Sequence, residues 1–473
     1  MLNRTTKTNG SNFSQIQIDK LISHYSNSEF NATLTLAKQL IKKGPPLGIY
    51  YNIIGAVYIE KGQIKLALQN FKKFVELQPE NPIALNNLGV ALYGQKKSQE
   101  AKTVLEKAIK INPNYAEAYN NLGNVYKEAK DYMTAINCYS DAIKINSNFA
   151  KAHYNKGNAL QDNGDMDGAL ESFNKALEIN PNSAQSHYSM GIVYRDIGKK
   201  ELAKKSFQKA VIIDPNHFDS LWNLHGTSQS IKEAQSWIKR CLKVNGDYIG
   251  SILMQAALNF YQGNEADYDA LLKSNLKDHP VMRSFEWVFN LPTLPPLYFC
   301  RWSFFNSIIS KSLKERPFYE YGVWRGNSFK YLIKSFKKGY GFDTFTGLPE
   351  DWHDTKAGSY SSKGIVPEIK GGKFIIGEFK DSLPKFFSQS RPLASLINFD
   401  SDLYSSTICA LSYSKSVIDE HTILIFDELI MNKNWEKDEY RALNEFCCTN
   451  GYKYEVMAVS FFTKQVAVKL ISH

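Results

Sequence analysis

Four short segments in the second half of this chain combine glycines and acids in a pattern that could hold a ligand and act on it. In order, they offer a glycine-rich turn, an acid that ends an apolar run, two acids one residue apart, and two adjacent acids. An enzyme that holds a nucleoside cofactor beside a metal ion needs these groups. The segments are EYGVWRGNS (320–328), GFDTFTGLP (341–349), FDSDLYSST (399–407) and LIFDEL (424–429).

The first segment has the pattern E-x-G-x-x-x-G-x-S, which runs from Glu320 through Gly322 and Gly326 to Ser328. Glycine permits a tight turn and a close approach of ligand to backbone, and a following helix would present its N-terminus. Glycine turns after strands are common, so this pattern alone indicates little. Asp343 adds weight because it ends the next apolar run 21 residues after Gly322. An acid at that place and distance is typical of one that binds ribose hydroxyls.

The remaining acids lie at the ends of two apolar runs. Asp400 and Asp402 alternate at the end of one run, and Asp427 and Glu428 end the next. Carboxylates from neighbouring strand ends can converge on a hard divalent cation such as Mg²⁺. Such an ion would lower the pKa of a substrate hydroxyl, and a carboxylate would remove its proton. The alternative is that these acids cap loops or helices. This alternative is easier to accept for any single acid than for all four together.

The elements that must position these groups alternate along the second half of the chain. Apolar, strand-like runs are separated by helix-like stretches such as NSFKYLIKSFKK and DEYRALNEFCCTN. This alternation predicts a parallel sheet with helices on both faces, with ligands at the carboxyl ends of its strands. The runs are FYEYGVW, KGYGFD, KFIIGEF, ASLINFD, TILIFDEL, YKYEVMAV and TKQVAVKLI.

Together with GFDTFTGLPEDW, IIGEFKDSLPKF and EYRALNEF, these segments resemble, in order, the macrocin O-methyltransferase (TylF-like) family of S-adenosylmethionine-dependent enzymes. The resemblance implies a Rossmann-like class I methyltransferase domain over residues 297–473. It implies that Glu320 and the turn Gly322–Ser328 hold the methionine part of the cofactor. It further implies that Asp343 holds the ribose and that the loop Gly377–Phe379 lies near the adenine.

The same resemblance implies roles for the carboxylates. Asp400, Asp427 and Glu428 correspond to Mg²⁺ ligands, and Asp402 to the general base that deprotonates the acceptor hydroxyl before it attacks the methyl group. Many relatives have two aspartates where this chain has Asp427 and Glu428, so Glu428 departs from the pattern. The expected acceptor is a hydroxyl on a small molecule, a sugar or a peptide.

The first half of the chain repeats with a period of 34 residues. Glycines, alanines and large apolar residues recur in step, and prolines close most units. The pattern resembles the tetratricopeptide repeat, in which small residues let two antiparallel helices approach and stacked units share a core. We expect an all-helical superhelix with degenerate ends over residues 15–275. A flexible tail, 1–14, would precede it and a proline-containing linker, 276–296, would follow. The repeat glycines are Gly55, Gly89, Gly123, Gly157 and Gly191.

Asparagines recur two residues before three of the repeat glycines, at Asn87, Asn121 and Asn155, and Asn223 takes this place in a degenerate unit. One interpretation is simple consensus drift in an Asn-rich protein. The other is a groove lined with amides that bind the backbone of an extended peptide, because an amide offers both a donor and an acceptor.

Composition limits the other classes. The net charge is +10, but lysines are spread along helical segments beside glutamates, which indicates solvated faces and no nucleic-acid partner. Six cysteines without CxxC or zinc spacing are typical of reduced thiols in a cytoplasmic protein. The first residues lack the apolar core of a signal peptide, and no apolar run is long enough to predict a membrane span.

The leading interpretation is therefore an O-methyltransferase whose repeat array recruits the acceptor or a partner protein. One alternative is a glycosyltransferase that uses D-x-D to bind a metal–nucleotide sugar. The order of the segments disfavours it, because the glycine turn comes first and D-x-D late. The other alternative is an adaptor with an inactive methyltransferase domain, which the intact glycines and acids disfavour.

Overall fold

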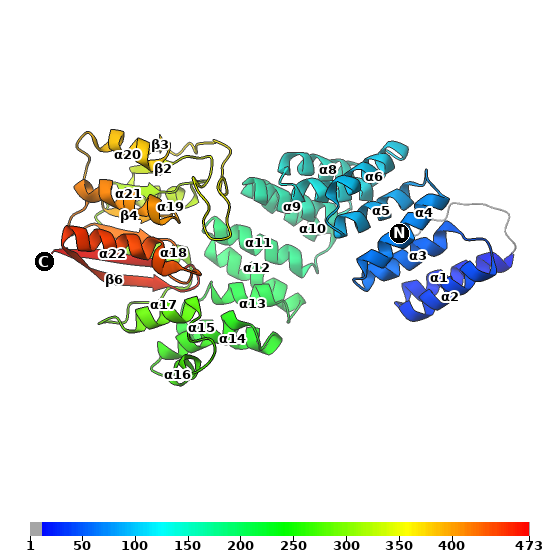
Figure 1. The fold of residues 1–473 in the computed structure, drawn as a ribbon, viewed down its shortest axis with the longest axis horizontal. Helices are drawn as coiled ribbons and strands as arrows, with labels where there is room; N and C mark the ends of the chain where they lie inside the picture. Colours follow the sequence, from blue (N-terminus) through cyan, green and yellow to red (C-terminus); the bar gives the residue numbers. More distant parts are fainter. Residues whose placement is uncertain (1–11, 473) are drawn as a thin grey trace. The chain divides into compact units, whose positions relative to one another are not determined.

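The computed structural model describes residues 12–472, which form two compact units divided between Asn182 and Ser183 (Figure 1). Of the predicted flexible tail, residues 1–11 lie outside the described residues, and the first helix already begins at Asn12. Within residues 12–472, no helix combines the length and apolarity that crossing a bilayer requires.

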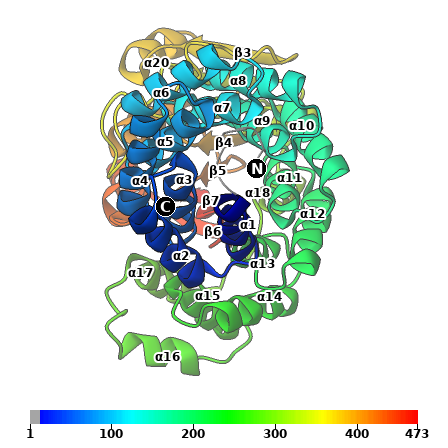
Figure 2. The same ribbon diagram turned by 90° about the vertical axis from the view of Figure 1, so that its right-hand side faces the viewer.

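Unit 1 consists of helices that pack as antiparallel pairs. In the pairs from α3/α4 to α9/α10, the first helix lies on the inner side of the curve that this unit forms (Figure 2). The helices are α1 (Asn12–Ser26), α2 (Phe30–Lys43), α3 (Gly48–Glu60), α4 (Ile64–Leu77), α5 (Pro82–Gly94), α6 (Ser98–Ile111), α7 (Ala116–Glu128), α8 (Tyr132–Ile145), α9 (Ala150–Asn163) and α10 (Met166–Ile179).

The repeat glycines explain how closely the two helices of a pair approach. A Cβ atom added to Gly123 on α7 would lie 2.6 Å from the ring of Tyr139 on α8, which is fully buried. Gly157 faces Phe173 in the same way. The 34-residue pattern of glycine and large apolar residue therefore marks where one helix of each pair rests on the other.

Unit 2 begins with further helix pairs and continues into a sheet. Its helices before the sheet are α11 (Ala184–Asp196), α12 (Lys200–Ile213), α13 (Phe218–His225), α14 (Ile231–Val244), α15 (Ile249–Phe260), α16 (Ala266–Leu272), α17 (Pro280–Phe289) and α18 (Arg301–Lys311). Those that follow the first strand are α19 (Asn327–Phe336), α20 (Phe379–Phe387), α21 (Tyr404–Ser414) and α22 (Glu439–Asn450).

All seven predicted strands form one mixed sheet in the order β3-β2-β1-β4-β5-β7-β6. The five strands β1 to β5 are paired in parallel, whereas β7 is antiparallel to both β5 and β6. The expectation of a parallel sheet is therefore corrected at the edge formed by β7 and β6. Only four residues separate β6 from β7, and so short a connection can join only antiparallel strands. The strands are β1 (Phe318–Tyr321), β2 (Gly339–Asp343), β3 (Gly372–Ile376), β4 (Leu396–Phe399), β5 (Ile423–Phe426), β6 (Tyr452–Ser460) and β7 (Gln465–Ser472).

Helices cover both faces of this sheet, as predicted. Alternate residues of the strands enter two different apolar clusters, one shared with α18 and α19 and the other with α20, α21 and α22. Phe318 and Tyr319, neighbours on β1, lie in opposite clusters and are both fully buried. The carboxyl ends of β1, β2, β4 and β5 thereby face the same edge of the domain.

The segment 276–296, expected as a linker, is packed against the sheet domain. It contains α17, where Arg283 pairs with Glu436 at 2.5 Å and Ser284 Oγ accepts the Met431 N–H at 2.8 Å. Directly after it, the Tyr298 N–H donates to the Val459 carbonyl of β6 at 2.9 Å. The division of the chain observed in the packing therefore lies within the repeats, between Asn182 and Ser183, instead of at 276–296.

The last repeat-like helices and the sheet domain share side-chain contacts within unit 2. The Trp302 Nε1–H on α18 donates to the carbonyl of Arg195 on α11 at 2.6 Å. A Cβ on Gly226, after α13, would lie 2.4 Å from the Phe462 ring of the β6–β7 turn. His225 is fully buried, 5.2 Å from Phe462 between ring centroids, and burial lowers its pKa to about 3. A neutral imidazole at this position is therefore part of a continuous aromatic core.

Candidate functional site

A pocket of about 620 Å³ opens at the carboxyl ends of β1, β2, β4 and β5. The strand order reverses between β1 and β4, and ligands of open α/β sheets bind where this happens. The turn after β1, the loop after β2, the start of α20 and the acids after β4 and β5 line the pocket. The segments chosen from the sequence thus meet around one cavity.

The glycine turn is fixed by a close contact with the end of β4. Gly322 has φ +88°, and a Cβ atom there would lie 1.8 Å from the carbonyl oxygen of Asp400. No other residue type fits this position. Gly326 has φ +73° and directly precedes α19, so the turn delivers the chain to the helix start, as predicted.

Asp343 lies at the end of β2 and lines the pocket, where it holds the glycine turn. Its Oδ2 accepts the N–H groups of Val323 and Trp324, each at 2.7 Å, and its Oδ1 accepts the Phe345 N–H at 2.6 Å. The carboxylate therefore ties the β1 turn to β2. These bonds leave room for a ribose hydroxyl, because each carboxylate oxygen can accept more than one hydrogen bond. Ribose binding by Asp343 stays a prediction.

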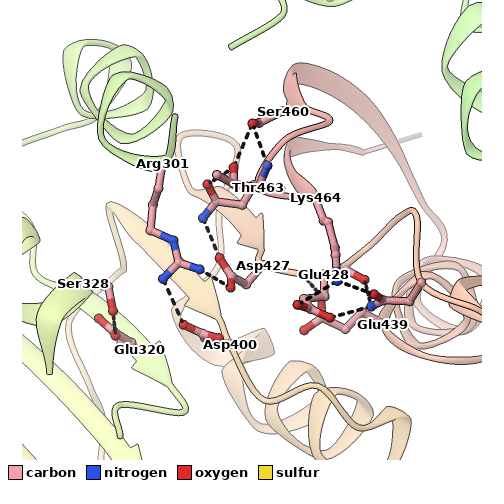
Figure 3. A network of polar contacts seen from close by, with 12 residues as sticks. Arg301, Glu320, Ser328, Asp400, Asp427, Glu428, Glu439, Ser460, Thr463 and Lys464 are labelled. Carbon is pink, nitrogen blue, oxygen red and sulfur yellow. Dashed lines mark hydrogen bonds and ion pairs between the residues drawn. The ribbon is translucent and has the colours of Figure 1, made fainter. Parts of the chain in front are cut away.

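Glu320 and Ser328, eight residues apart in the sequence, are brought together by the turn. The Ser328 hydroxyl donates to Glu320 Oε1 at 2.5 Å (Figure 3). Glu320 is fully buried, and its Oε2 has no hydrogen-bond partner among the described residues. Burial raises the pKa of Glu320 to about 8, although Ser328 and Arg301 act in the opposite direction. A buried oxygen without a donor fits a ligand that brings a cationic or N–H group.

The loop expected near an adenine also reaches the pocket. Gly377 has φ +128°, and its N–H donates to the Asp343 carbonyl at 3.0 Å, which fixes the path of the loop after β3. Phe379, at the start of α20, lines the pocket together with Glu378 and Lys380. Gly377 therefore positions the loop, whereas Phe379 offers a ring to the cavity.

The proposed metal ligands face a cation supplied by the chain itself. Arg301, the first residue of α18, places Nη2 2.5 Å from Asp427 Oδ2 and Nη1 3.9 Å from Asp400 Oδ2 (Figure 3). The other oxygen of Asp427 accepts the Gln465 Nε2–H at 2.5 Å. Burial opposes the charge of Arg301, but Asp427 and Asp400 raise its pKa above the usual range. The position expected for Mg²⁺ between Asp400 and Asp427 is occupied by a guanidinium.

Glu428 is likewise engaged by side chains. Its Oε2 accepts the Asn432 Nδ2–H at 2.6 Å, and its Oε1 lies 3.3 Å from Lys464 Nζ. In the part of the chain that the structure describes, no three His, Cys, Asp or Glu side chains are arranged to hold a metal ion. A metal site formed by Asp400, Asp427 and Glu428 stays a prediction. Arg301, Lys464 and amide groups already bond to Asp427 and Glu428, and Arg301 lies 3.9 Å from Asp400.

Asp402 differs from Asp427 and Glu428 because no donor within residues 12–472 bonds to its carboxylate. Its backbone has φ +60°, a left-handed conformation that turns the chain after β4, and the residue lines the pocket. Burial, with Glu428 and Asp427, raises its pKa to about 7, against the effect of Lys464 and Arg301. The role of Asp402 as a general base stays a prediction.

Sequence reasoning missed the basic partners of the acids. Arg301 follows Cys300, whose sulfur accepts the Ser303 N–H at 3.4 Å and caps α18. Lys464 has φ +61° in the short β6–β7 turn. Neither residue belongs to a motif. The sequence did indicate that such partners must exist, because four acids clustered in a buried site require cations nearby. It did not indicate which basic residues these are.

The asparagines of unit 1 form a chain of side-chain hydrogen bonds between repeats. Asn87 Nδ2 donates to Asn52 Oδ1 at 2.7 Å, and Asn121 Nδ2 donates to Asn86 Oδ1 at 2.8 Å. Asn155 Nδ2 donates to Asn120 Oδ1 at 2.9 Å. The predicted stripe therefore has an intramolecular role that simple consensus drift does not describe.

Asn223 belongs to a different arrangement in unit 2. Its Oδ1 accepts the Arg195 Nη1–H at 2.7 Å, and its Nδ2 donates to the Asp219 carbonyl at 2.8 Å. Asn223 is buried, so the structure gives it no free face toward a peptide.

Comparisons with known proteins identify the repeats. The family models described as tetratricopeptide repeat and TPR repeat match segments that together span 55–205, so this region carries tetratricopeptide repeats. A comparison with curated proteins gives no match. The matched segments are 82–115 and 150–183, 104–137 and 172–205, and 55–96 and 123–164.

Among solved structures, the chain is similar to MamA, with 28% identity over 34% of this chain and 95% of MamA and a TM-score of 0.31. It is also similar to YrrB, described as a TPR protein with an unusual peptide-binding site, with 22% identity over 38% of this chain and 95% of YrrB and a TM-score of 0.32. The pilF protein of Pseudomonas aeruginosa is 17% identical over 44% of this chain and 94% of its own, with a TM-score of 0.39. These likenesses concern helical repeats.

Proposed function

We propose that unit 2 binds S-adenosylmethionine and transfers its methyl group to an acceptor hydroxyl. The observation that carries this proposal is the pocket at the reversal of strand order, closed by a turn that only glycine can form at Gly322. Its volume of about 620 Å³ lies in the range of cofactor sites. The resemblance of the segments around it to TylF-like methyltransferases supports the same reaction.

The residues around the pocket fit this cofactor. Its sulfonium, when bound, supplies the electrophilic methyl group. The unpaired Oε2 of buried Glu320 would accept from the amino group of its methionine part, and Ser328 keeps that carboxyl oriented. Asp343 would accept a ribose hydroxyl, and the ring of Phe379 would pack against the adenine. Each of these side chains comes from a different strand end or helix start, so the fold itself sets their spacing.

Asp402 is the base that the site offers for the acceptor. Its carboxylate faces the pocket without a bonded donor, and a pKa of about 7 lets it take a proton near neutral pH. Arg301 lies across the site with its guanidinium beside Asp400 and Asp427. A hydroxyl placed between Asp402 and Arg301 would lose its proton to the carboxylate while the cation stabilises the resulting oxygen charge.

The first experiment is thermal unfolding of the full chain with S-adenosylmethionine, a nucleotide sugar, or neither. We expect stabilisation by S-adenosylmethionine alone. Phe379→Ala should reduce this effect because it removes a pocket-lining ring. Ile376→Ala, at an exposed position at the end of β3, is the matched control and should keep it. Stabilisation by the nucleotide sugar would favour glycosyl transfer, and stabilisation by neither would favour an adaptor.

We also propose that the repeats bind a peptide or protein segment. The matches of residues 55–205 to tetratricopeptide models support this role. An amide nitrogen has two N–H groups, so Asn87 and Asn121 each keep one beyond the bond to the preceding repeat. Peptides selected from a random display library on the full chain should lose affinity when Asn121 is changed to Ser. Selection of no peptide, or equal affinity for the variant, would contradict this proposal.

A further inference from the structure

The charge balance of the carboxylate cluster differs from that of a metal site. Asp400, Asp402, Asp427 and Glu428 bring four acids to the ends of β4 and β5, and Arg301 and Lys464 bring two cations into contact with three of them. Together these two cations carry the charge of one divalent ion. Both are anchored by elements outside the strand ends, Arg301 by α18 and Lys464 by the β6–β7 turn.

The geometry of Arg301 also matches that of a bridging cation. One guanidinium nitrogen contacts Asp427 and the other lies beside Asp400, so the planar group spans the gap between the two strand ends (Figure 3). The Asp427 side chain is only 7% exposed, and its second oxygen is taken by Gln465, itself fully buried. A divalent ion at Asp427 would have to take the place of the Arg301 guanidinium, because one oxygen bonds to this cation and the other is held by Gln465.

The position of Arg301 is secured by its neighbours. It is the first residue of α18, and Trp302, the next, is buried and hydrogen-bonded to the carbonyl of Arg195. Lys200 Nζ on α12 lies 3.3 Å from Ser303 Oγ. The start of α18 is therefore held on the repeat-like helices, and the guanidinium enters the cluster from a fixed backbone.

We propose that Arg301 is a built-in replacement for the divalent cation of this carboxylate cluster, so that the site neither binds nor requires a divalent metal. The arginine bridges Asp400 and Asp427 and presents its remaining N–H groups to the pocket, where it stabilises negative charge on a ligand oxygen. Metal binding can be measured without any methyl acceptor. Failure of this proposal is therefore distinguishable from failure of the proposed methyl transfer.

The test is a titration of Mn²⁺, used as a paramagnetic substitute for Mg²⁺, into the full chain at neutral pH, with free Mn²⁺ measured by electron paramagnetic resonance. Wild type should bind no Mn²⁺ below millimolar concentration. Arg301→Met keeps an unbranched, flexible stem and removes the guanidinium with its charge, so it should bind Mn²⁺ at least tenfold more tightly. Lys380→Met removes one positive charge from the pocket wall away from the cluster and should behave as wild type.

Each outcome decides the proposal. Tight binding of one Mn²⁺ by wild type would overturn it, whatever the variants do. If wild type and Arg301→Met both fail to bind, the cluster is no metal site in either form, and the role given to Arg301 is wrong. Should Arg301→Met not fold, as judged by circular dichroism, the thermal unfolding of wild type decides instead. No shift with Mg²⁺ or with a chelator is expected, and a rise in Tm with Mg²⁺ that the chelator reverses would refute the proposal.

Discussion

Replacing Glu320 by glutamine should stabilise the fold at neutral pH and weaken cofactor binding. The Glu320 side chain is fully buried, and burial raises its pKa from 4.5 to about 8. Between these values the unfolded chain has lost a proton that the folded protein keeps, so the folded state loses stability as the pH rises. The contribution of Glu320 is thus fully present below pH 4.5 and is lost as the pH rises through about 8.

The magnitude follows from the two pKa values. Each pH unit between them costs about 1.4 kcal/mol of unfolding free energy, which gives about 3 kcal/mol at pH 7 and at most about 5 kcal/mol above pH 8. Glutamine has nearly the same shape, can still accept from Ser328 and never ionises. The free energy of unfolding of Glu320→Gln relative to wild type should therefore rise by about 3 kcal/mol between pH 4.5 and pH 7.

Urea unfolding of both proteins at several pH values, followed by tryptophan fluorescence, measures this difference. Constant effects of the substitution on packing cancel when two pH values are compared. A difference that does not change with pH would show that Glu320 is already ionised in the folded protein and would refute the reasoning. Calorimetry should show weaker S-adenosylmethionine binding to the variant, and equal affinity would remove this carboxylate from the cofactor site.

Three further outcomes are expected. Gly123→Ala should destabilise unit 1 by about 1–3 kcal/mol, because its methyl group would overlap the ring of Tyr139; unchanged urea unfolding would contradict that packing. Asn120→Ala removes a buried acceptor between repeats and should cost about 1–3 kcal/mol, measured in the same way. A fragment of residues 183–473 should fold and bind S-adenosylmethionine, whereas 290–473 should aggregate because it exposes the partners of α11 and α13. A soluble, binding-competent 290–473 fragment would show that those contacts are dispensable.

The repeats and strands could be predicted because each leaves a local signal in the sequence. The period of 34 residues records where Gly123 and its equivalents meet a ring on the next helix, and every predicted apolar run became a strand. The antiparallel direction of β7 was not predicted, although the connection before Gln465 is too short to join two parallel strands. Alternation of strands and helices predicts layers, but direction within a sheet depends on the length of each connection.

The candidate site was predictable in position and less so in chemistry. Asp343 and Asp402 gather at one pocket, together with Ser328, the partner of buried Glu320, because parallel strand ends share an edge. What surrounds each acid depends on side chains from distant elements. Arg301 arrives from a helix before the first strand and Lys464 from the last turn, and neither has a spacing that relates it to the acids. The contacts of the expected linker 276–296 with the sheet domain could not be read from its prolines, because prolines indicate a break in periodicity and say nothing of tertiary contacts.

The amide chain of unit 1 has a direction. From Asn155 to Asn52, each side chain donates its N–H toward the carbonyl of the next, so the bond dipoles point the same way along the array. Reversing a single amide would set two carbonyls or two NH₂ groups face to face, so the orientation of each side chain fixes that of its neighbours. A repeat unit inserted with its asparagine pair in register would lengthen this chain of hydrogen bonds. A unit with leucines at those positions would divide the chain into two segments whose amide orientations are independent.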